Sequence, residues 1–261
     1  MQLSEYTKLN YGIDLSGKRT MVEGRLRSLL TSQGHQDYQA YLQCLLADKT
    51  GQEAATLMNR LSTNYTFFMR EESHFKFFAN VILPYLSTSV KNKDLRIWSA
   101  GCSSGEEPYT LAMLISDFLG QSKAIWDRKI LATDISLQAL ETALIARYNE
   151  EQIRALPVNW QRQYFEQREP GVWYLLPGIR SEVIFRKFNL MEKFFPFKKK
   201  FQVIFCRNVM IYFDDETKRQ LVNRFYEATE EGGYLLIGHS ESINRQATKY
   251  RYVQPSIYRK E

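Results

Sequence analysis

The segment Arg96–Pro108, RIWSAGCSSGEEP, joins an apolar run, a loop with two glycines and the start of a helical pattern. A tight strand-to-helix turn of this kind lets the backbone approach a nucleotide-like ligand, which then faces the N–H groups of the helix N-terminus. The glycine spacing is G-x-x-x-G, which fits neither the dinucleotide fingerprint G-x-G-x-x-G nor the P-loop with its Gly-Lys-Ser/Thr. The loop therefore favours neither NAD nor ATP, and taken alone it is equally compatible with a structural turn.

Apolar runs alternate with helical patterns from about residue 95 onward. Four of these runs are typical of buried strands: Leu95–Gly101, Lys129–Ile135, Phe201–Arg207 and Gly233–His239. Helical patterns follow three of them: Glu107–Leu119, Ser136–Ala146 and Asp214–Thr229. Because parallel strands need crossover connections, this order predicts an α/β fold with a doubly wound, mostly parallel sheet.

Two regions depart from this alternation. Between Val172 and Leu190 the β-rich runs VWYLL and VIFRKFNL are separated only by PGIRSE, which contains a Pro-Gly turn signal. We expect these runs to form a small antiparallel subdomain, at about residues 166–188, inserted in the α/β domain. Near the C-terminus, YRYVQPSIYRK predicts one or two further strands at an antiparallel edge of the sheet.

Residues 1–62 show helical patterning, so we expect a helical N-terminal domain before an α/β domain of residues 63–261. Helices are predicted over Gly17–Leu30, Asp37–Leu46 and Gln52–Leu61. The first of them carries an apolar stripe: Met21, Val22, Leu26, Leu29 and Leu30. Its four cations against the single Glu23 give a local charge of +3: Lys18, Arg19, Arg25 and Arg27. Such a helix suits an acidic partner, or it is simply a solvated basic face.

The composition, with 44% hydrophobic and 25% charged residues, is that of an ordinary soluble globular protein. No apolar run approaches the roughly 18 residues that a membrane-spanning helix requires, and the first residues lack the apolar core of a signal peptide. The three cysteines lie far apart and in no metal-ligand spacing, which favours a reducing compartment. We therefore expect a cytoplasmic protein, whose net charge of +6 weakly favours an acidic partner.

Polar residues follow the predicted strands at their carboxyl ends, where open α/β sheets bind ligands. Asp134 can accept hydrogen bonds from both hydroxyls of a ribose, although a lone Asp at a strand end is usually a helix cap. Glu106 and Glu107 fall in the first helical turn, where the helix dipole favours a carboxylate, and one of them can pair with a ligand ammonium group. Arg207 and Asn208 leave a buried strand together, which favours a ligand contact over packing.

Six motifs occur in a fixed order: TNYTFFMREESHF, RIWSAGCSSGEEPYTLAM, ATDIS, FNL, FCRNVMIYF and GGYLLIGHSES. Together they resemble the chemoreceptor glutamate methyltransferase family of the CheR type, over residues 62 to about 242. The set is specific, although no single motif is. The resemblance implies a Rossmann-like fold and transfer of a methyl group from S-adenosylmethionine to glutamate side chains of methyl-accepting chemotaxis receptors. The products are glutamate methyl esters and S-adenosylhomocysteine, and the reaction serves sensory adaptation.

The resemblance also implies which residues form the site. The cofactor is expected to contact the following residues: Asn64, Thr66, Arg70, Gly101, Glu106, Asp134, Asn189, Leu190, Arg207 and Asn208. Within this set Glu106 would hold the methionine part and Asp134 the ribose. Arg70 and Tyr212 would be the catalytic residues, and we expect them to orient the substrate carboxylate without transferring a proton. Ser99 stands where other methyltransferases carry an acidic residue, which makes Glu106 the more credible ammonium partner.

The implied partner is the helical bundle of a chemoreceptor, with the enzyme recruited to membrane receptor arrays. We expect the basic N-terminal helix to dock it through Lys18, Arg19, Arg25 and Arg27. We expect no metal, no bound nucleic acid and no membrane insertion. We also expect the protein to be a monomer. The loop EQREPG, with Gly171 as its only glycine, is short, which predicts methylation without a C-terminal pentapeptide tether.

Two alternatives stay open at this point. One is a methyltransferase of RNA or of a small molecule, although Arg207–Met210 replaces the Asn-Pro-Pro-Tyr typical of methyltransferases that act on nitrogen. The other is a catalytically silent module that senses S-adenosylmethionine or its product. His35, His74 and His239 form no recognisable nucleophile or metal pattern in the sequence, so no chemistry is assigned to them.

Overall fold

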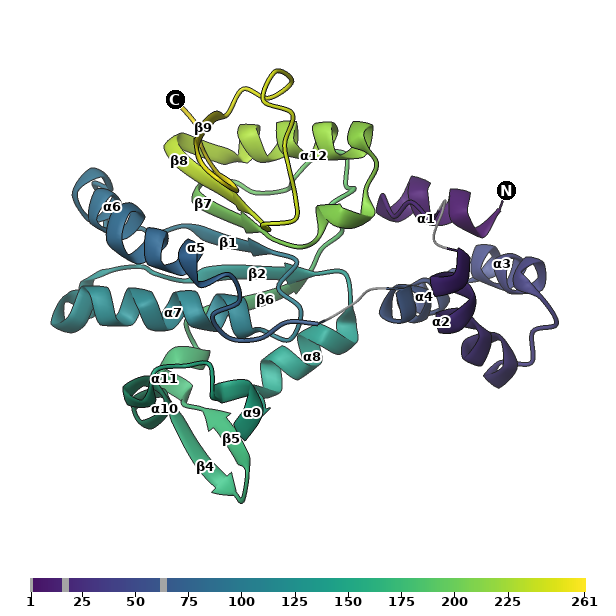
Figure 1. Ribbon diagram of the computed structural model, residues 1–261, viewed down its shortest axis with the longest axis horizontal. Helices are drawn as coiled ribbons and strands as arrows, with labels where there is room; N and C mark the ends of the chain where they lie inside the picture. Colours follow the sequence, from purple (N-terminus) through teal and green to yellow (C-terminus); the bar gives the residue numbers. More distant parts are fainter. Residues whose placement is uncertain (1, 16–18, 62–64) are drawn as a thin grey trace.

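The computed structural model describes residues 2–15, 19–61 and 65–261, which form a helical N-terminal domain and a larger α/β domain (Figure 1). The α/β domain is built on a seven-stranded sheet in the order β6-β2-β1-β7-β8-β10-β9. Its strands are β1 Ile97–Ala100, β2 Ile130–Asp134, β6 Val183–Lys187, β7 Phe201–Cys206, β8 Thr229–Ile237, β9 Arg251–Gln254 and β10 Ile257–Arg259. The first five in this spatial order are parallel, whereas β10 pairs antiparallel with both β8 and β9. The predicted mostly parallel sheet and its antiparallel C-terminal edge are confirmed.

Helices cover both faces of this sheet. The helices of the α/β domain outside its small inserted sheet are α5 Glu72–Phe77, α6 Leu83–Ser89, α7 Glu106–Leu119, α8 Leu137–Ile145, α11 Pro177–Arg180 and α12 Asp215–Ala228, with a π-helical turn Phe78–Ile82 and 3-10 turns Gly120–Ile125 and Met210–Tyr212. Since successive strand residues point to opposite faces, Ile97 packs in one apolar core with Leu111 of α7. Its neighbour Trp98 packs in the other core with Phe225 of α12. The fold is therefore doubly wound, as predicted.

The small antiparallel sheet contains different strands from those expected. Its order is β3-β5-β4, with β3 Arg147–Asn149, β4 Phe165–Glu169 and β5 Val172–Leu175. The helices α9 Glu150–Ile153 and α10 Val158–Tyr164 lie between β3 and β4 in the chain. The predicted pairing of VWYLL with VIFRKFNL is wrong, because VIFRK is β6 and lies parallel to β2. Val183 and Phe185 point into the main core, and that burial draws the strand away from its sequence neighbour β5. The insert thus extends over 147–175 and not over 166–188.

The N-terminal domain consists of α1 Leu3–Tyr11, α2 Arg19–Ser32, α3 Tyr38–Ala47 and α4 Gln52–Leu61. The three predicted helices are confirmed within two residues at each end, whereas α1 was not predicted as a separate helix. Leu26, Leu29 and Leu30 of the predicted stripe are buried in the core of this domain, and Val22 packs against it. No helix among the described residues is long and apolar enough to cross a membrane.

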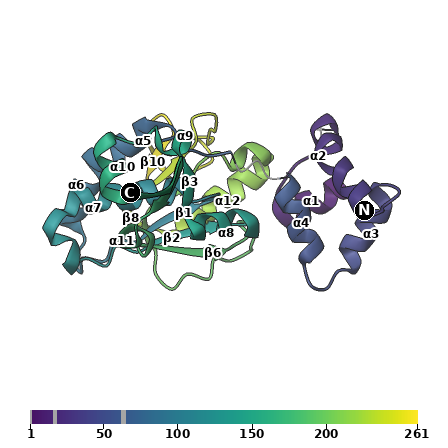
Figure 2. The same cartoon turned by 90° about the horizontal axis from the view of Figure 1, so that it is seen from below.

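The two domains meet beside the strand ends of the α/β domain, and Figure 2 shows the N-terminal helices gathered at one end of the molecule. The N–H of Asp14 donates to the carbonyl of Tyr212 (2.9 Å), which follows β7. The side-chain amide of Asn189, which follows β6, donates to the carbonyl of Asn10 (2.7 Å). The N-terminal domain is therefore bonded directly to segments in which functional residues are predicted.

Candidate active site

A cavity lies where β1, β2, β6 and β7 end and where the N-terminal domain approaches them. Nine of the residues predicted for the site line it: Thr66, Arg70, Gly101, Asp134, Asn189, Leu190, Arg207, Asn208 and Tyr212. Asn64 lies outside the described residues. Residues separated by up to about 150 positions in the chain thus share one cavity, because parallel strands end at the same edge of the sheet.

Gly101 begins the glycine loop in a conformation that only glycine adopts easily. Its φ of 95° lies in the left-handed region, and a Cβ there would come within 2.3 Å of Val209 Cγ2. The N–H groups of Gly101 and Cys102 both donate to the carbonyl of Thr133 (2.8 and 2.9 Å), which fixes the loop against β2. The loop backbone is thereby held at the wall of the cavity.

Asp134 holds the other side of this loop. Its Oδ2 accepts from the N–H of Ser103 (2.8 Å) and its Oδ1 from the N–H of Ser136 (2.9 Å). Burial raises the pKa of this carboxyl, although these hydrogen bonds act in the opposite direction. Each oxygen keeps a lone pair, so Asp134 can accept from two ribose hydroxyls while it supports the loop.

The two glutamates that begin α7 point to different places. Glu106 is fully buried, does not line the cavity, and accepts from the hydroxyl of Ser104 (2.7 Å). Glu107 does line the cavity and accepts from the hydroxyl of Ser99 (2.7 Å) and from Nη1 of Arg207 (2.9 Å). Successive helical residues point about 100° apart, so only one of the two can face a given ligand. Glu107 therefore faces the cavity, whereas Glu106, the residue predicted to hold the methionine part, does not line it.

Arg207 is buried between two carboxylates, with 3% of its side chain exposed. Nη1 binds Glu107, whereas Nη2 and Nε both bind Oε2 of Glu71 (3.1 and 3.3 Å). Nη2 also donates to the carbonyl of Arg70, and the guanidinium lies 5.1 Å from the ring centre of Phe75. Arg207 is therefore held in one place, and the sequence alone did not identify Glu71 as its partner.

Asn208 adopts a left-handed backbone conformation, with φ of 59°. Its N–H donates to Glu241 (2.9 Å), whose buried carboxylate also accepts from the N–H groups of Gly238 (2.6 Å) and Ile211 (3.2 Å). Burial raises the pKa of Glu241, against the effect of these bonds. Glu241 thus fixes the segment after β7, a role hinted at only by its place in the GHSES motif.

Arg70 and Tyr212, the predicted catalytic pair, both line the cavity. Nη1 of Arg70 donates to the carbonyl of Tyr65 (2.8 Å), which directs the guanidinium along the 65–70 loop. Tyr212 ends a short 3-10 turn, and its carbonyl is bonded to the N-terminal domain through Asp14. The side chain of Asn189 likewise serves the contact with Asn10, so its amide holds the two domains together beside the cavity.

The N-terminal domain supplies an apolar wall that sequence reasoning missed. Tyr11, Ile13, Met58 and Leu61 line the cavity from this side. Apolar residues in α1 and α4 have the spacing of ordinary core residues, so no sequence signal distinguishes the few that face a ligand.

The cations predicted to dock a receptor are only partly described. Lys18 and the side chain of Arg19 lie outside the described part of the structure. Arg25 donates from its guanidinium to the carbonyl of Leu61 at the end of α4, so its charge supports the domain itself. Arg27 is exposed on α2.

Two models of known protein domains match the chain. The model of the SAM binding domain of CheR methyltransferases matches residues 64–258, and that of their all-alpha domain matches residues 1–62. The chain belongs to the CheR methyltransferase family. It is 41% identical to a chemotaxis protein methyltransferase of Borreliella burgdorferi, over 99% of this chain and 94% of that protein. It is 37% identical to chemotaxis protein methyltransferase 1 of Pseudomonas aeruginosa, over 94% of this chain and 90% of that protein. It is 35% identical to the chemotaxis protein methyltransferase of Escherichia coli, over 92% of this chain and 82% of that protein. As a member of this family, the chain is an S-adenosylmethionine-dependent methyltransferase.

Proposed function

We propose that this enzyme binds S-adenosylmethionine in the cavity at the strand ends and transfers its methyl group to glutamate side chains of chemoreceptors. The observation that carries the proposal is the convergence of nine residues, predicted from separate motifs, on one cavity. Methylation of receptor glutamates is the role of the CheR methyltransferase family, to which the chain belongs.

The donor groups around the cavity fit the parts of the cofactor. Glu107 offers a carboxylate for the methionine ammonium group, and Asp134 offers two acceptors for the ribose hydroxyls. Phe188, Leu190 and the apolar wall of the N-terminal domain surround the space left for an adenine ring. Gly101 lets the loop backbone approach the ligand without a side chain in between.

The reaction needs little chemical assistance from the protein. A glutamate substrate is already ionised at neutral pH, so no general base is required. Sulfonium and carboxylate combine to give two neutral products, and a site that excludes water favours this loss of charge. What remains is in-line placement of a carboxylate oxygen and the methyl group. We assign this orientation to Arg70 and Tyr212, without proton transfer.

The substrate carboxylate must not be held too strongly. An arginine bound tightly to it would stabilise the ground state and slow the transfer. Arg70 already donates to the carbonyl of Tyr65, so part of its hydrogen-bonding capacity is used within its own loop. A geometric role for Arg70 follows from this arrangement.

Docking would involve the exposed Arg27 of α2 against the acidic surface of a receptor bundle at the cytoplasmic side of receptor arrays. The enzyme would act as a monomer. β4 and β5 are joined by Pro170 and Gly171 alone, and this short connection with one glycine supports the expectation that no receptor pentapeptide tether is needed. Titration with a receptor C-terminal pentapeptide ending in an aromatic residue tests this last point, and micromolar binding would contradict it.

Transfer of tritiated methyl groups from S-adenosylmethionine tests the proposed function. Purified cytoplasmic domains of chemoreceptors should be labelled, and the label should be released as methanol in alkali, because carboxylate esters are base-labile. RNA and a receptor with its methyl-accepting glutamates changed to alanine serve as controls. Label in RNA, or binding of the cofactor without any transfer, would refute the proposal.

A further inference from the structure

Three segments of the chain meet at the carboxylate of Glu71, which does not line the cavity itself. Its Oε1 accepts from Nδ2 of Asn208 (3.2 Å) and from the N–H of His239 (3.1 Å). Its Oε2 accepts from Nη2 and Nε of Arg207 (3.1 and 3.3 Å). Glu71 thus connects the 65–71 loop to the ends of β7 and β8, and two of its partners line the cavity.

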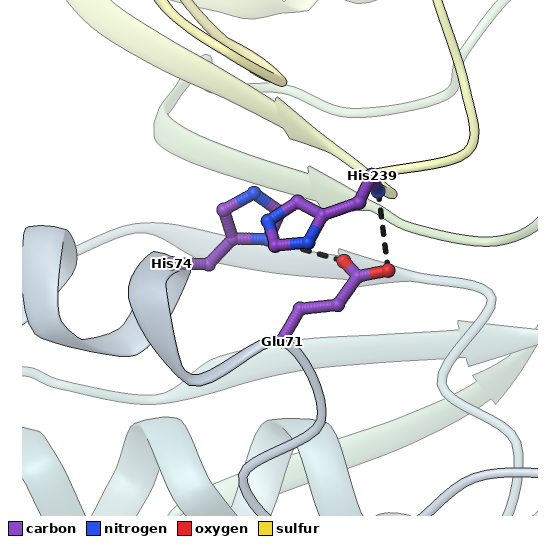
Figure 3. A group of neighbouring side chains, drawn as sticks. All are labelled: Glu71, His74 and His239. Atoms are coloured by element: carbon purple, nitrogen blue, oxygen red, sulfur yellow. Dashed lines mark hydrogen bonds and ion pairs between the residues drawn. The ribbon is translucent and has the colours of Figure 1, made fainter.

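Two histidines cover this carboxylate (Figure 3). Nδ1 of the buried His74 lies 3.4 Å from Oε2 of Glu71, and the rings of His74 and His239 are T-shaped with centres 4.5 Å apart. Burial, with the neighbouring charge of Arg207, lowers the pKa of His74 to about 3, so this ring is neutral. Burial raises the pKa of Glu71, but Arg207 and the hydrogen bonds from His239 and Asn208 lower it more, which keeps the carboxylate ionised.

Glu71, His74 and His239 also have the composition of a metal site, with ligand atoms within 4.8 Å of one another. The carboxylate already accepts four hydrogen bonds, and a carboxylate offers about four lone pairs. A divalent cation here would also lie beside the buried charge of Arg207. The charge that Glu71 balances is therefore that of the arginine.

We propose that Glu71 is a positioning residue for cofactor binding, which holds Arg207 so that Glu107 stays available to the methionine ammonium group. This inference rests on the proposed function. Arg207 uses Nη1 for Glu107 and commits Nη2 and Nε to Glu71. Without Glu71, the guanidinium is free to form a two-bond pair with Glu107, the arrangement that arginine and carboxylate prefer. That pair, together with the bond from the hydroxyl of Ser99, would leave Glu107 about one lone pair for the ammonium group.

The balance of charge leads to the same conclusion. Glu71 and Glu107 against Arg207 leave one net negative charge, which attracts the ammonium group of the zwitterionic amino-acid end. With Glu71 neutralised, the charges of Arg207 and Glu107 cancel, and the attraction of the cluster for the ligand ammonium weakens. The backbone is fitted to this role, since Met69 and Glu71 have φ of 60° and 57° on either side of Arg70. Such conformations persist where the surrounding contacts fix them, here the four bonds to Glu71.

The variant Glu71→Gln tests the proposal by calorimetry with two ligands. S-adenosylhomocysteine carries the ammonium group, whereas 5′-methylthioadenosine lacks the whole amino-acid end. We expect the Kd for S-adenosylhomocysteine to rise by about tenfold or more, and that for methylthioadenosine to change less than about threefold. The control Glu72→Gln makes the same chemical change on an adjacent, exposed carboxylate and should leave both constants as in the wild type.

Equal weakening of both ligands in Glu71→Gln would assign Glu71 to the fold alone, and unchanged binding of both would remove it from the site. Where the glutamine variant does not fold, Glu71→Asp keeps the charge but shortens the reach by one methylene, and should raise only the Kd for S-adenosylhomocysteine. Its failure to do so would equally overturn the proposal. Absence of S-adenosylhomocysteine binding by the wild-type enzyme would instead refute the proposed function.

Discussion

Replacing each of the two glutamates at the start of α7 by glutamine distinguishes the residue that meets the cofactor. Glu107→Gln removes the charge of the carboxylate that lines the cavity, while its amide oxygen can still accept from Arg207. Glu106→Gln makes the same change one residue earlier, at a fully buried side chain that does not line the cavity. The two variants therefore make the same chemical change, and they differ only in whether the altered side chain lines the cavity.

The expected magnitude follows from the contacts of each residue. A hydrogen bond between charged partners contributes about 1.5–3 kcal/mol, so losing the charge at Glu107 should raise the Kd for S-adenosylhomocysteine roughly 10- to 150-fold. Burial raises the pKa of Glu106, so a neutral glutamine is well tolerated there, and the hydroxyl of Ser104 can still donate to it. Its Kd should stay within about threefold of the wild type.

Isothermal titration of S-adenosylhomocysteine into the wild type and both variants measures these constants, and a thermal melt of each protein checks that it is folded. The assignment would be refuted if Glu106→Gln weakened binding as much as Glu107→Gln, or more. That result would place the ammonium group on the side of α7 that faces Ser104.

Further predictions concern catalysis, docking and stability. Tyr212→Phe and Arg70→Ala should each lower kcat at least about tenfold and weaken binding of S-adenosylhomocysteine much less. Equal losses of kcat and of affinity would show that these residues serve the cofactor or the fold. Arg27→Glu should raise the KM for the receptor and weaken the salt dependence of that KM. The same charge reversal at the exposed Lys198 serves as the control and should change neither. Unaltered receptor kinetics in Arg27→Glu would show that α2 is not part of the docking surface. The lowered pKa of His74 means that the unfolded chain binds its proton first, so the stability that this neutral ring contributes is complete above about pH 6.5 and is lost as the pH falls towards 3. Between pH 7 and 5 the unfolding free energy of the wild type should fall by about 2 kcal/mol more than that of His74→Gln. Denaturant titrations at several pH values measure this difference, and the same pH dependence in both proteins would contradict the prediction.

Much of the fold could be predicted because strands buried on both faces form continuous apolar runs. β1, β2, β7 and β8 were all predicted from such runs, and each overlaps its predicted range. The strand β6 was assigned to the wrong sheet, because its partner β2 lies about 50 residues earlier and no local signal specifies a distant pairing. Pro177 ends the strand region before it, but it begins the short helix α11 and not the predicted turn between paired strands.

The site was predictable where strand ends set the position of a residue. Asp134 is the last residue of β2 and Arg207 directly follows β7, so the sheet brings them together regardless of the loop conformations. Glu106 and Glu107 both fall in the first helical turn, and only the rotation of α7 about its axis decides which one faces the cavity. Glu71 could not be found, because its partner Arg207 is 136 residues away and the bond depends on a left-handed backbone conformation.

The structure of the enzyme with S-adenosylhomocysteine bound is the most direct test of the central claim, that one cavity between the two domains holds the cofactor. The account predicts the ammonium group within hydrogen-bonding distance of Glu107, the ribose hydroxyls beside Asp134, and the adenine against Leu190 and the apolar wall that includes Tyr11. A ligand bound outside this cavity would contradict the account.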